Sequence, residues 1–253
     1  MFEIEFLGTG TSTGVPQIGC DCEVCRSADA RDKRLRSSVI VHTGGKNILI
    51  DCGPDFRTQI LRCGDLSIDC VLLTHVHYDH VGGIDDLRPF TKDKPLPVYA
   101  QRDVISDLEA RLPYCFQEHP YPGVPKFKFV EIDYRHSFCF DDIEIEPIAV
   151  MHYKLPILGF RIGKFAYVTD AKTIPADQVE KLRGLDTLVI NALQFEQHLS
   201  HMTLDEALAV IREVNPRRAY LTHMGHHIGL HAKTDKLLPE NVRLAYDGLI
   251  VKG

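Results

Sequence analysis

The sequence lacks long hydrophobic runs and lacks an excess of positive charge. No apolar stretch approaches the roughly 20 residues that a membrane-spanning helix needs, so we expect no membrane association. The opening stretch, MFEIEFLGTG, has neither the basic start nor the long apolar run of a signal peptide, and we therefore expect a cytoplasmic protein. The formal net charge of −6 at pH 7 argues against a surface that coats large nucleic acids.

Internal repeats, low-complexity tracts and linker-like segments are missing as well. We therefore expect residues 1–253 to fold as one domain, a size that suits a layered α/β architecture. The hydrophobic fraction is 44% and the charged fraction is 25%, as in an ordinary globular protein. In a reducing compartment, we expect the eight cysteines to be thiols or metal ligands rather than disulfides.

Short apolar runs alternate with turn signals along the whole chain. The runs that we predict to be strands are 4–8, 37–43, 46–53, 70–75, 97–100, 126–132, 137–140, 143–152, 157–162, 165–170, 187–193 and 218–224, with a further pair of strands around Asp247–Gly248. Helices are predicted at 104–112, 175–185 and 203–214, the last with a capping box of Thr203 and Glu206. Two β-rich halves that each carry helices predict two packed sheets with helices outside.

The stretch LLTHVHYDHVGG carries three histidines and an aspartate directly after an apolar run. His75, His77, Asp79 and His80 form the pattern H-x-H-x-D-H. Neutral imidazoles and a carboxylate are ligands that suit Zn²⁺, Mn²⁺ or Fe. Because the ligands follow one another where a strand opens into a glycine-containing loop, this spacing can serve two neighbouring metal ions.

H-x-H-x-D-H after a strand resembles the signature of the metallo-β-lactamase superfamily. The superfamily pattern continues with a histidine, an aspartate and a histidine, each after an apolar strand. The segments VMH, YVTD and YLTH supply His152, Asp170 and His223 in that order. The resemblance implies an α/β fold, the αββα sandwich, in which two mixed β-sheets are flanked by helices.

The resemblance also implies that these residues bind two divalent metal ions, either zinc or manganese. The implied ligands are His75, His77 and His152 for one ion, Asp79, His80 and His223 for the other, and Asp170 as the bridge. A hydroxide that bridges two such ions can attack a phosphoryl or carbonyl group, and Asp79 is counted among the catalytic residues. Asp51, at the end of NILID, resembles an early aspartate of the superfamily; we expect it to orient a metal ligand or to cap a turn.

A second cluster of potential ligands lies in GCDCEVC. Its cysteines, in the pattern C-x-C-x-x-C, are Cys20, Cys22 and Cys25. Three thiolates need a fourth ligand to close a tetrahedral zinc site. In the branch of the superfamily that includes the phosphodiesterase PhnP, the second histidine of a T-H-x-x-H segment completes such a site. THMGH places His226 there, with His227 as the competitor and His231 as a more distant alternative. This resemblance implies a structural zinc in a loop of about residues 19–36.

The segment SHMTLDEAL places His201 directly before the helix predicted at 203–214. Hydrolysis of a phosphodiester requires that the leaving oxygen be stabilised or protonated. The sequence H-x-T at this point is shared with the phosphodiesterase branch, which includes RNase Z and PhnP, and this resemblance makes His201 the general acid. A surface histidine near a helix cap is the alternative, and the nearby His198 is a competitor for the role.

Two further segments are basic or glycine-rich. GTGTSTGVP, residues 8–16, resembles a phosphate cradle but lacks the P-loop lysine, so we expect turns beside the active site. The basic run consists of Arg31, Lys33, Arg34 and Arg36. Most such runs are solvated, and we expect the same of this one, with a role in holding a substrate phosphate as the alternative.

The sequence therefore favours a metal-dependent phosphodiesterase that acts on small or cyclic nucleotide-type phosphodiesters, with a homodimer as the expected assembly. The tRNA-processing branch carries a long arm between the residues that match His152 and Asp170, which leave no room for it here. Two alternatives remain. One is a thioester or lactam hydrolase of the same fold, and the other is a non-hydrolytic metal-binding accessory protein resembling PqqB.

Overall fold

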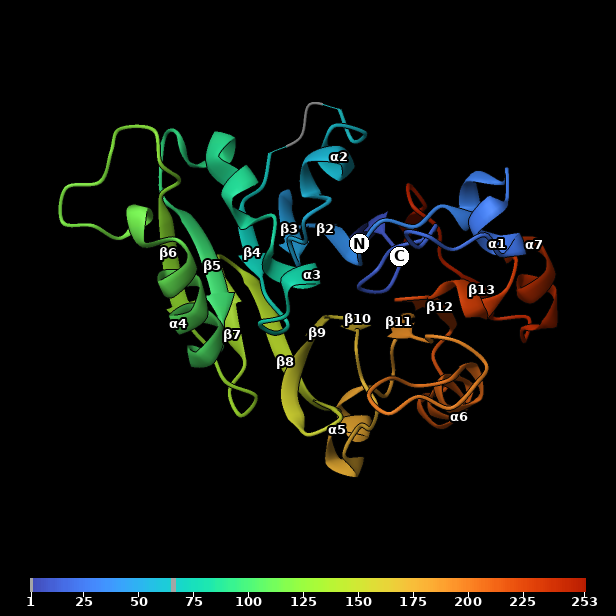
Figure 1. The fold of residues 1–253 in the computed structure, drawn as a ribbon. Coiled ribbons are helices and arrows are strands. Elements are labelled where there is room, and N and C mark those ends of the chain that lie inside the picture. Colours follow the sequence, from blue (N-terminus) through green and yellow to red (C-terminus); the bar gives the residue numbers. More distant parts are fainter. Residues whose placement is uncertain (1, 65–66) are drawn as a thin grey trace.

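In the computed structural model, which describes residues 2–64 and 67–253, the strands form two mixed sheets of seven strands each. The first sheet has the order β14 (Ile250–Lys252), β1 (Phe2–Gly8), β2 (Ser38–Thr43), β3 (Lys46–Ile50), β4 (Cys70–Leu72), β5 (Leu96–Ala100), β6 (Phe127–Glu131). The second has the order β13 (Val242–Leu244), β12 (Arg218–Thr222), β11 (Thr187–Asn191), β10 (Phe165–Val168), β9 (Leu155–Ile162), β8 (Ile143–His152), β7 (Phe138–Phe140). The two sheets face each other (Figure 1).

Helices cover the outer faces of both sheets, as Figure 1 shows for α2 against the first sheet and for α5 and α6 against the second. The α-helices are α1 (Glu23–Arg26), α2 (Phe56–Ile60), α3 (Tyr78–Val81), α4 (Arg102–Arg111), α5 (Ala176–Lys181), α6 (Leu204–Val214) and α7 (His231–Thr234). Short 3-10 helices are Ala30–Asp32, Ile84–Thr91, Pro113–Cys115, His226–Ile228 and Asp235–Leu237. The predicted αββα sandwich is confirmed.

The core has three principal layers, which follow from the two-sided burial of the strands. One cluster fills the space between the sheets, with Phe160, Phe165 and Tyr167 among its fully buried side chains. A second lies between the second sheet and helices α5 and α6, and a third between the first sheet and helices α2 and α4. Because central strands are buried on both faces, they read as continuous apolar runs in the sequence.

Most predicted elements are present, with ends that differ by a few residues. The capping box of Thr203 and Glu206 is confirmed, with both hydrogen bonds formed at the start of α6. The pair of strands around Asp247–Gly248 is corrected, because β13 and β14 belong to different sheets and do not pair. The intervening turn is held instead by Asp247, which accepts hydrogen bonds from Thr9 Oγ1 and Leu35 N.

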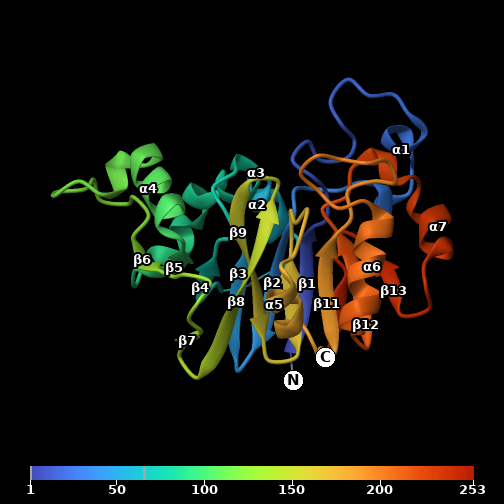
Figure 2. The same ribbon diagram turned by 90° about the horizontal axis from the view of Figure 1, so that it is seen from below.

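Among the described residues, no helix combines the length and apolar character that crossing a bilayer requires. Figure 2 shows both termini at one edge of the sandwich and α3 at the opposite edge. The predicted ligands gather at the edge where α3 lies.

Candidate metal centre

Four strands deliver the predicted metal ligands to one edge of the sandwich. His152 is the last residue of β8, His223 directly follows β12, and Asp170 lies two residues after β10. The H-x-H-x-D-H segment follows β4 and continues into α3. Since β10, β11 and β12 are parallel to one another, and β3, β4 and β5 likewise, the carboxyl ends of these strands meet at the same edge.

One group of ligands consists of Asp79, His80, Asp170 and His223, whose ligating atoms all lie within 4.8 Å of one another. His80 Nε2 lies 3.1 Å from Asp79 Oδ2 and 3.2 Å from Asp170 Oδ2. His223 Nε2 lies 3.1 Å from Asp170 Oδ1. Neither Nε2 atom has a hydrogen-bond partner among the described residues. Two buried imidazole nitrogens that face two carboxylates suit a divalent cation.

The remaining predicted ligands lie beside this group. His75 Nε2 and His77 Nδ1 are 3.0 Å apart. The ring centroid of His152 lies 5.1 Å from that of His77 and 5.7 Å from that of His75. His152 and Asp170 also have ligating atoms within 4.8 Å of each other, so Asp170 lies between the two sets of histidines. This position suits a carboxylate that bridges two ions.

Hydrogen bonds donated by the Nδ1 atoms fix the tautomers of three histidines. His80 Nδ1 donates to Asp51 Oδ2 at 2.7 Å, and His152 Nδ1 donates to the Asp170 carbonyl at 2.8 Å. Thr74 Oγ1 donates to Asp51, so it accepts from His75 Nδ1 at 3.0 Å. In its neutral form each of these rings then carries the lone pair on Nε2, which is the form that binds a metal.

Three residues of the site have left-handed backbones: Asp51 with φ +62°, Asp170 with φ +55° and His223 with φ +56°. Residues with side chains adopt this region rarely, and each instance costs about 1–3 kcal/mol. All three follow the end of a strand, where the chain must turn sharply so that the side chain points into the site. The strain therefore coincides with two predicted ligands and with the residue that accepts a hydrogen bond from His80.

The charges of the site favour a cation between the carboxylates. Burial alone would raise the pKa of Asp170, but the imidazoles of His223 and His80 outweigh burial and hold this pKa well below its usual range. Burial alone would likewise lower the pKa of His80, yet the carboxylates of Asp170, Asp79 and Asp51 raise it well above the ordinary value. A position where carboxylates retain their charge and attract a proton is also one that attracts a metal ion.

His201 lies against both sets of ligands. Its Nδ1 atom is 3.8 Å from Asp170 Oδ1, and its ring centroid is 4.8 Å from those of His152 and His223. Burial, together with the neighbouring His223, lowers the pKa of His201 to about 3. The imidazole is therefore neutral at pH 7. The competitor His198 has its ring centroid 5.1 Å from that of His201, and its Nδ1 accepts a hydrogen bond from Ser200 N.

The cysteine cluster lies in the N-terminal loop next to the 3-10 helix His226–Ile228. The Nδ1 atom of His226 lies 3.3 Å from the sulfurs of Cys20 and Cys22 and 3.6 Å from that of Cys25. Ordinary zinc–sulfur and zinc–nitrogen bonds at tetrahedral angles place these atoms about 3.5 Å apart. A hydrogen bond from Cys25 N and the contact with His226 lower the pKa of Cys22 to about 6. The group therefore fits a closed zinc site, and His227 is not part of it.

The sequence analysis missed the threonines that precede the ligands. Thr74 holds both Asp51 and His75, and Thr169 Oγ1 donates to Asp170 Oδ2 at 2.7 Å. The signal was available in the repeated strand endings LLTH, YVTD and YLTH. It also missed Lys172, whose Nζ lies 2.8 Å from a carboxylate oxygen of the capping-box Glu206.

The glycine-rich loop lies beside the site, as expected, because Met224 N donates to Thr9 O and Thr11 N donates to Met224 O. The expectation of a solvated basic run is wrong for Arg34, which is 2% exposed. Its guanidinium donates to Thr9 Oγ1 at 2.9 Å and to the Ala245 carbonyl at 2.7 Å. A buried arginine of this kind ties the loop to the strand ends instead of meeting solvent.

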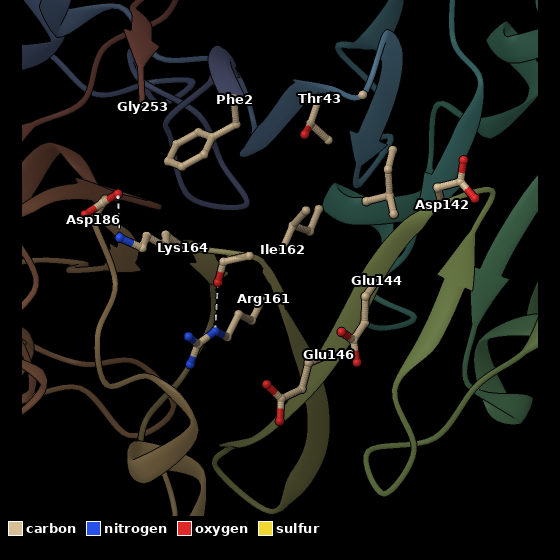
Figure 3. A pocket seen from close by; sticks show the side chains of 13 residues that line it. Phe2, Thr43, Asp142, Glu144, Glu146, Arg161, Ile162, Lys164, Asp186 and Gly253 are labelled. Atoms are coloured by element: carbon tan, nitrogen blue, oxygen red, sulfur yellow. Dashed lines mark hydrogen bonds and ion pairs between the residues drawn. The ribbon is translucent and has the colours of Figure 1, made fainter.

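A hollow of about 1000 Å³ lies at the opposite edge of the sandwich, near the termini, and contains none of the predicted ligands. Figure 3 shows charged side chains of both signs along it, with Arg161 bonded to the carbonyl of Gly163 and Lys164 near Asp186. It is open, and its charged groups lack the histidine and carboxylate arrangement of the metal centre. The predicted metal ligands therefore lie at the α3 edge, away from this hollow.

The model of the β-lactamase superfamily domain matches residues 46–224, which contain all seven ligands predicted for the dinuclear centre. The chain belongs to the metallo-β-lactamase superfamily. The crystal structure of a new diphosphatase from the PhnP family superposes with a TM-score of 0.93 at 37% identity, covering 100% of this chain and 98% of that one. The predicted likeness to the PhnP branch of the superfamily is thereby confirmed.

Two curated relatives of this chain carry names that do not refer to phosphodiesters or diphosphates. An octanoyltransferase of Porphyromonas gingivalis is 46% identical over 245 residues, which are 96% of this chain but 50% of that protein. This chain thus spans about half the length of that relative. The coenzyme PQQ synthesis protein B of Methylorubrum extorquens is 32% identical over 223 residues, 76% of this chain and 73% of that protein.

Proposed function

We propose that this protein is a metal-dependent hydrolase of small phosphodiesters or diphosphates. The observation that carries the proposal is the buried cluster of histidines and aspartates at the carboxyl ends of the strands, in which the Nε2 atoms of His80 and His223 have no hydrogen-bond partner among the described residues. The similarity to a diphosphatase of the PhnP family supports the phosphorus substrate.

The donor set fits two divalent ions, either zinc or manganese. The residues that would hold them are His75, His77, His152, Asp79, His80, His223 and the bridging Asp170. When bound, two such ions would supply Lewis-acid activation of water and of a phosphoryl oxygen. The hydrogen bonds to Asp51, Thr74 and the Asp170 carbonyl orient the imidazoles for this purpose.

His201 assists the departure of the leaving group in this proposal. In the free protein its imidazole is neutral, since burial lowers its pKa to about 3, and its Nδ1 has no hydrogen-bond partner among the described residues. An anionic phosphate bound beside it would raise this pKa, because a negative charge favours the protonated imidazole. The substrate would thus bring His201 into the form that can donate a proton to the leaving oxygen.

The cysteine site, in this proposal, holds a structural zinc through Cys20, Cys22, Cys25 and His226. His226 lies three residues after His223, so the zinc would fix the N-terminal loop against the strand end that carries an active-site ligand. A small phosphodiester remains the proposed substrate, and the net charge of −6 disfavours a large nucleic acid. A homodimer in the cytoplasm is the proposed setting.

The test compares His201→Ala with His198→Ala after reconstitution with metal. The substrates are bis-p-nitrophenyl phosphate, a 2′,3′-cyclic nucleotide and a dinucleoside diphosphate, with a panel of thioesters alongside. We expect metal-dependent turnover of phosphorus substrates, which in His201→Ala falls about 100-fold or more for the 2′,3′-cyclic nucleotide, because its alkoxide leaving group needs a proton. The other two substrates have leaving groups that depart without a proton and should lose less, and His198→Ala should change little. Thioester turnover that is indifferent to His201 would contradict the proposal.

A second candidate function is the hydrolysis of an acyl thioester. The observation that favours it is the 46% identity to a protein named octanoyltransferase, although half of that protein has no counterpart here. The same donor set could polarise a thioester carbonyl. His201 would then be dispensable, because a thiolate leaves without a proton donor.

A third candidate, a non-hydrolytic accessory protein, is favoured by the similarity to the coenzyme PQQ synthesis protein B. Such a protein needs no second ion at the cluster of Asp79, His80 and His223. Metal content per chain separates this candidate from the two hydrolases.

A further inference from the structure

The hairpin turn directly after His152 holds a tyrosine in a backbone conformation that tyrosine disfavours. Strands β8 and β9 pair His152 with Leu155, so the loop consists of Tyr153 and Lys154. Tyr153 has φ +55°. This position in a two-residue hairpin loop is normally taken by glycine, asparagine or aspartate, because a bulky side chain is strained there.

The other two-residue hairpin loops of the described chain follow that rule. The first loop residue has a positive φ in each: Gly44 between β2 and β3, Asp141 between β7 and β8, and Gly163 between β9 and β10. These three loops lie at the edge of the sandwich with the hollow of Figure 3. The strained tyrosine therefore occurs where the hairpin adjoins a predicted metal ligand, and retained strain of this kind points to a functional residue.

The ring of Tyr153 is available to a ligand. The residue is 47% exposed, although its neighbour His152 is buried. The ammonium group of Lys154 lies 5.3 Å from the ring centroid. An ammonium group can bind the anionic part of a ligand, and the neighbouring aromatic face can stack against its flat ring.

A second tyrosine lies next to the same pair of ligands. Tyr78 follows His77, is 63% exposed, and has its ring against the backbone of Gly82, where an added Cβ would be 2.8 Å from Cζ. The ring is therefore fixed on α3 and still exposed. His77 and His152, which precede the two tyrosines, have ring centroids 5.1 Å apart. The two exposed tyrosines thus each follow, in the chain, one of two predicted ligands whose rings lie side by side.

We propose that Tyr153, together with Tyr78, stacks against the base of a nucleotide whose phosphodiester or diphosphate lies at the metal centre. This inference rests on the proposed function, and it narrows the substrate to phosphorus esters that carry a nucleobase. Stacking on an aromatic ring is tolerant of base identity, because every base has a π face. The two tyrosines therefore contribute to affinity for nucleotides in general, with Lys154 near the phosphates.

The test uses two diesters with the same leaving group: the p-nitrophenyl ester of thymidine 5′-phosphate, which carries a base, and methyl p-nitrophenyl phosphate, which does not. The variants are Tyr153→Gly, which suits the turn, and Asp141→Gly as the matched control in an equivalent turn far from the metals. Glycine fits a positive φ in both turns, so both variants are expected to fold, which circular dichroism and metal content check.

We expect the wild type to favour the thymidine ester. Tyr153→Gly should lower kcat/KM for that ester about tenfold, mainly through KM, and leave the methyl ester within about twofold, as expected for one lost stacking contact. Asp141→Gly should change neither. Equal losses on both esters, or no loss on the thymidine ester, would overturn the stacking role while leaving the proposed function standing. If the metal-loaded wild type turned over neither ester, the proposed function itself would fail, and this inference with it.

Discussion

The substitution Asp51→Asn replaces one carboxylate oxygen by an NH₂ group next to the predicted ligand His80. Asp51 is fully buried and accepts from His80 Nδ1 at 2.7 Å, from Thr74 N at 2.9 Å and from Thr74 Oγ1 at 2.9 Å. An asparagine has one oxygen and one NH₂ group, so one of these donors must face another donor. If the oxygen stays with Thr74, the amide nitrogen faces the N–H group of His80.

The magnitude follows from the tautomer of His80. To avoid the clash of donors, the proton of His80 must move to Nε2, the atom that faces Asp79 and Asp170 at 3.1 and 3.2 Å. A protonated Nε2 cannot bind a metal. Changes to such supporting residues typically cost 10–100-fold in metal affinity or activity, or about 1.4–2.7 kcal/mol.

The assay is competition between the protein and a chromophoric chelator, followed by measurement of diester turnover at saturating metal. We expect Asp51→Asn to bind active-site metal about 10–100-fold more weakly, with the zinc at the cysteines retained. Asp69→Asn, which alters a carboxylate that accepts from Asn47 N in the same sheet, is the matched control and should behave as the wild type. Unchanged metal affinity and turnover in Asp51→Asn would refute the assignment of the tautomer.

Three further outcomes are expected. Cys25→Ser should remove about one zinc per chain and lower the Tm, whereas Cys139→Ser, which alters an exposed thiol, should do neither, as metal analysis and thermal melts check. Burial and a neighbouring guanidinium lower the pKa of His231 to about 4, so only the unfolded chain takes up the proton as the pH falls below 6.5. Between about pH 7 and pH 5 the wild type should therefore lose about 2 kcal/mol more unfolding free energy in urea than His231→Gln does. Lys172→Met removes the ion pair with Glu206 at the start of α6, which we expect to position the nearby His201. The variant should lower kcat about tenfold with unchanged metal content. An unchanged kcat would show that this ion pair does not position His201.

The sequence predicted which histidines and aspartates the fold brings together, because each lies in a short local pattern. The pattern H-x-H-x-D-H needs only one strand end, and the remaining ligands each follow an apolar run whose parallel neighbours bring the ends together. The capping box of Thr203 was likewise readable from residues three apart. Residues that are close in the sequence are also close in the folded structure, so such patterns can be recognised without knowing the fold.

Contacts between distant segments could not be predicted in the same way. Arg34 looks like part of a solvated basic run, but it is buried by Thr9 and by the Ala245 carbonyl more than 200 residues away. The last strands, β13 and β14, looked like a hairpin, but each pairs with a strand of a different sheet. The backbone strain at Tyr153 is invisible in the sequence because it depends on the length of the hairpin loop.

In the proposed function, Asp170 and the surrounding histidines would hold two divalent ions that are required for hydrolysis of phosphorus esters. The most direct measurement is the rate of bis-p-nitrophenyl phosphate hydrolysis as metal-depleted protein, with zinc retained at Cys20, Cys22, Cys25 and His226, is titrated with zinc or manganese. We predict that the rate rises until about two further equivalents per chain are bound, and that Asp170→Asn abolishes the rise. A rate that stays at the background level, or that saturates at about one equivalent, would contradict the dinuclear phosphodiesterase.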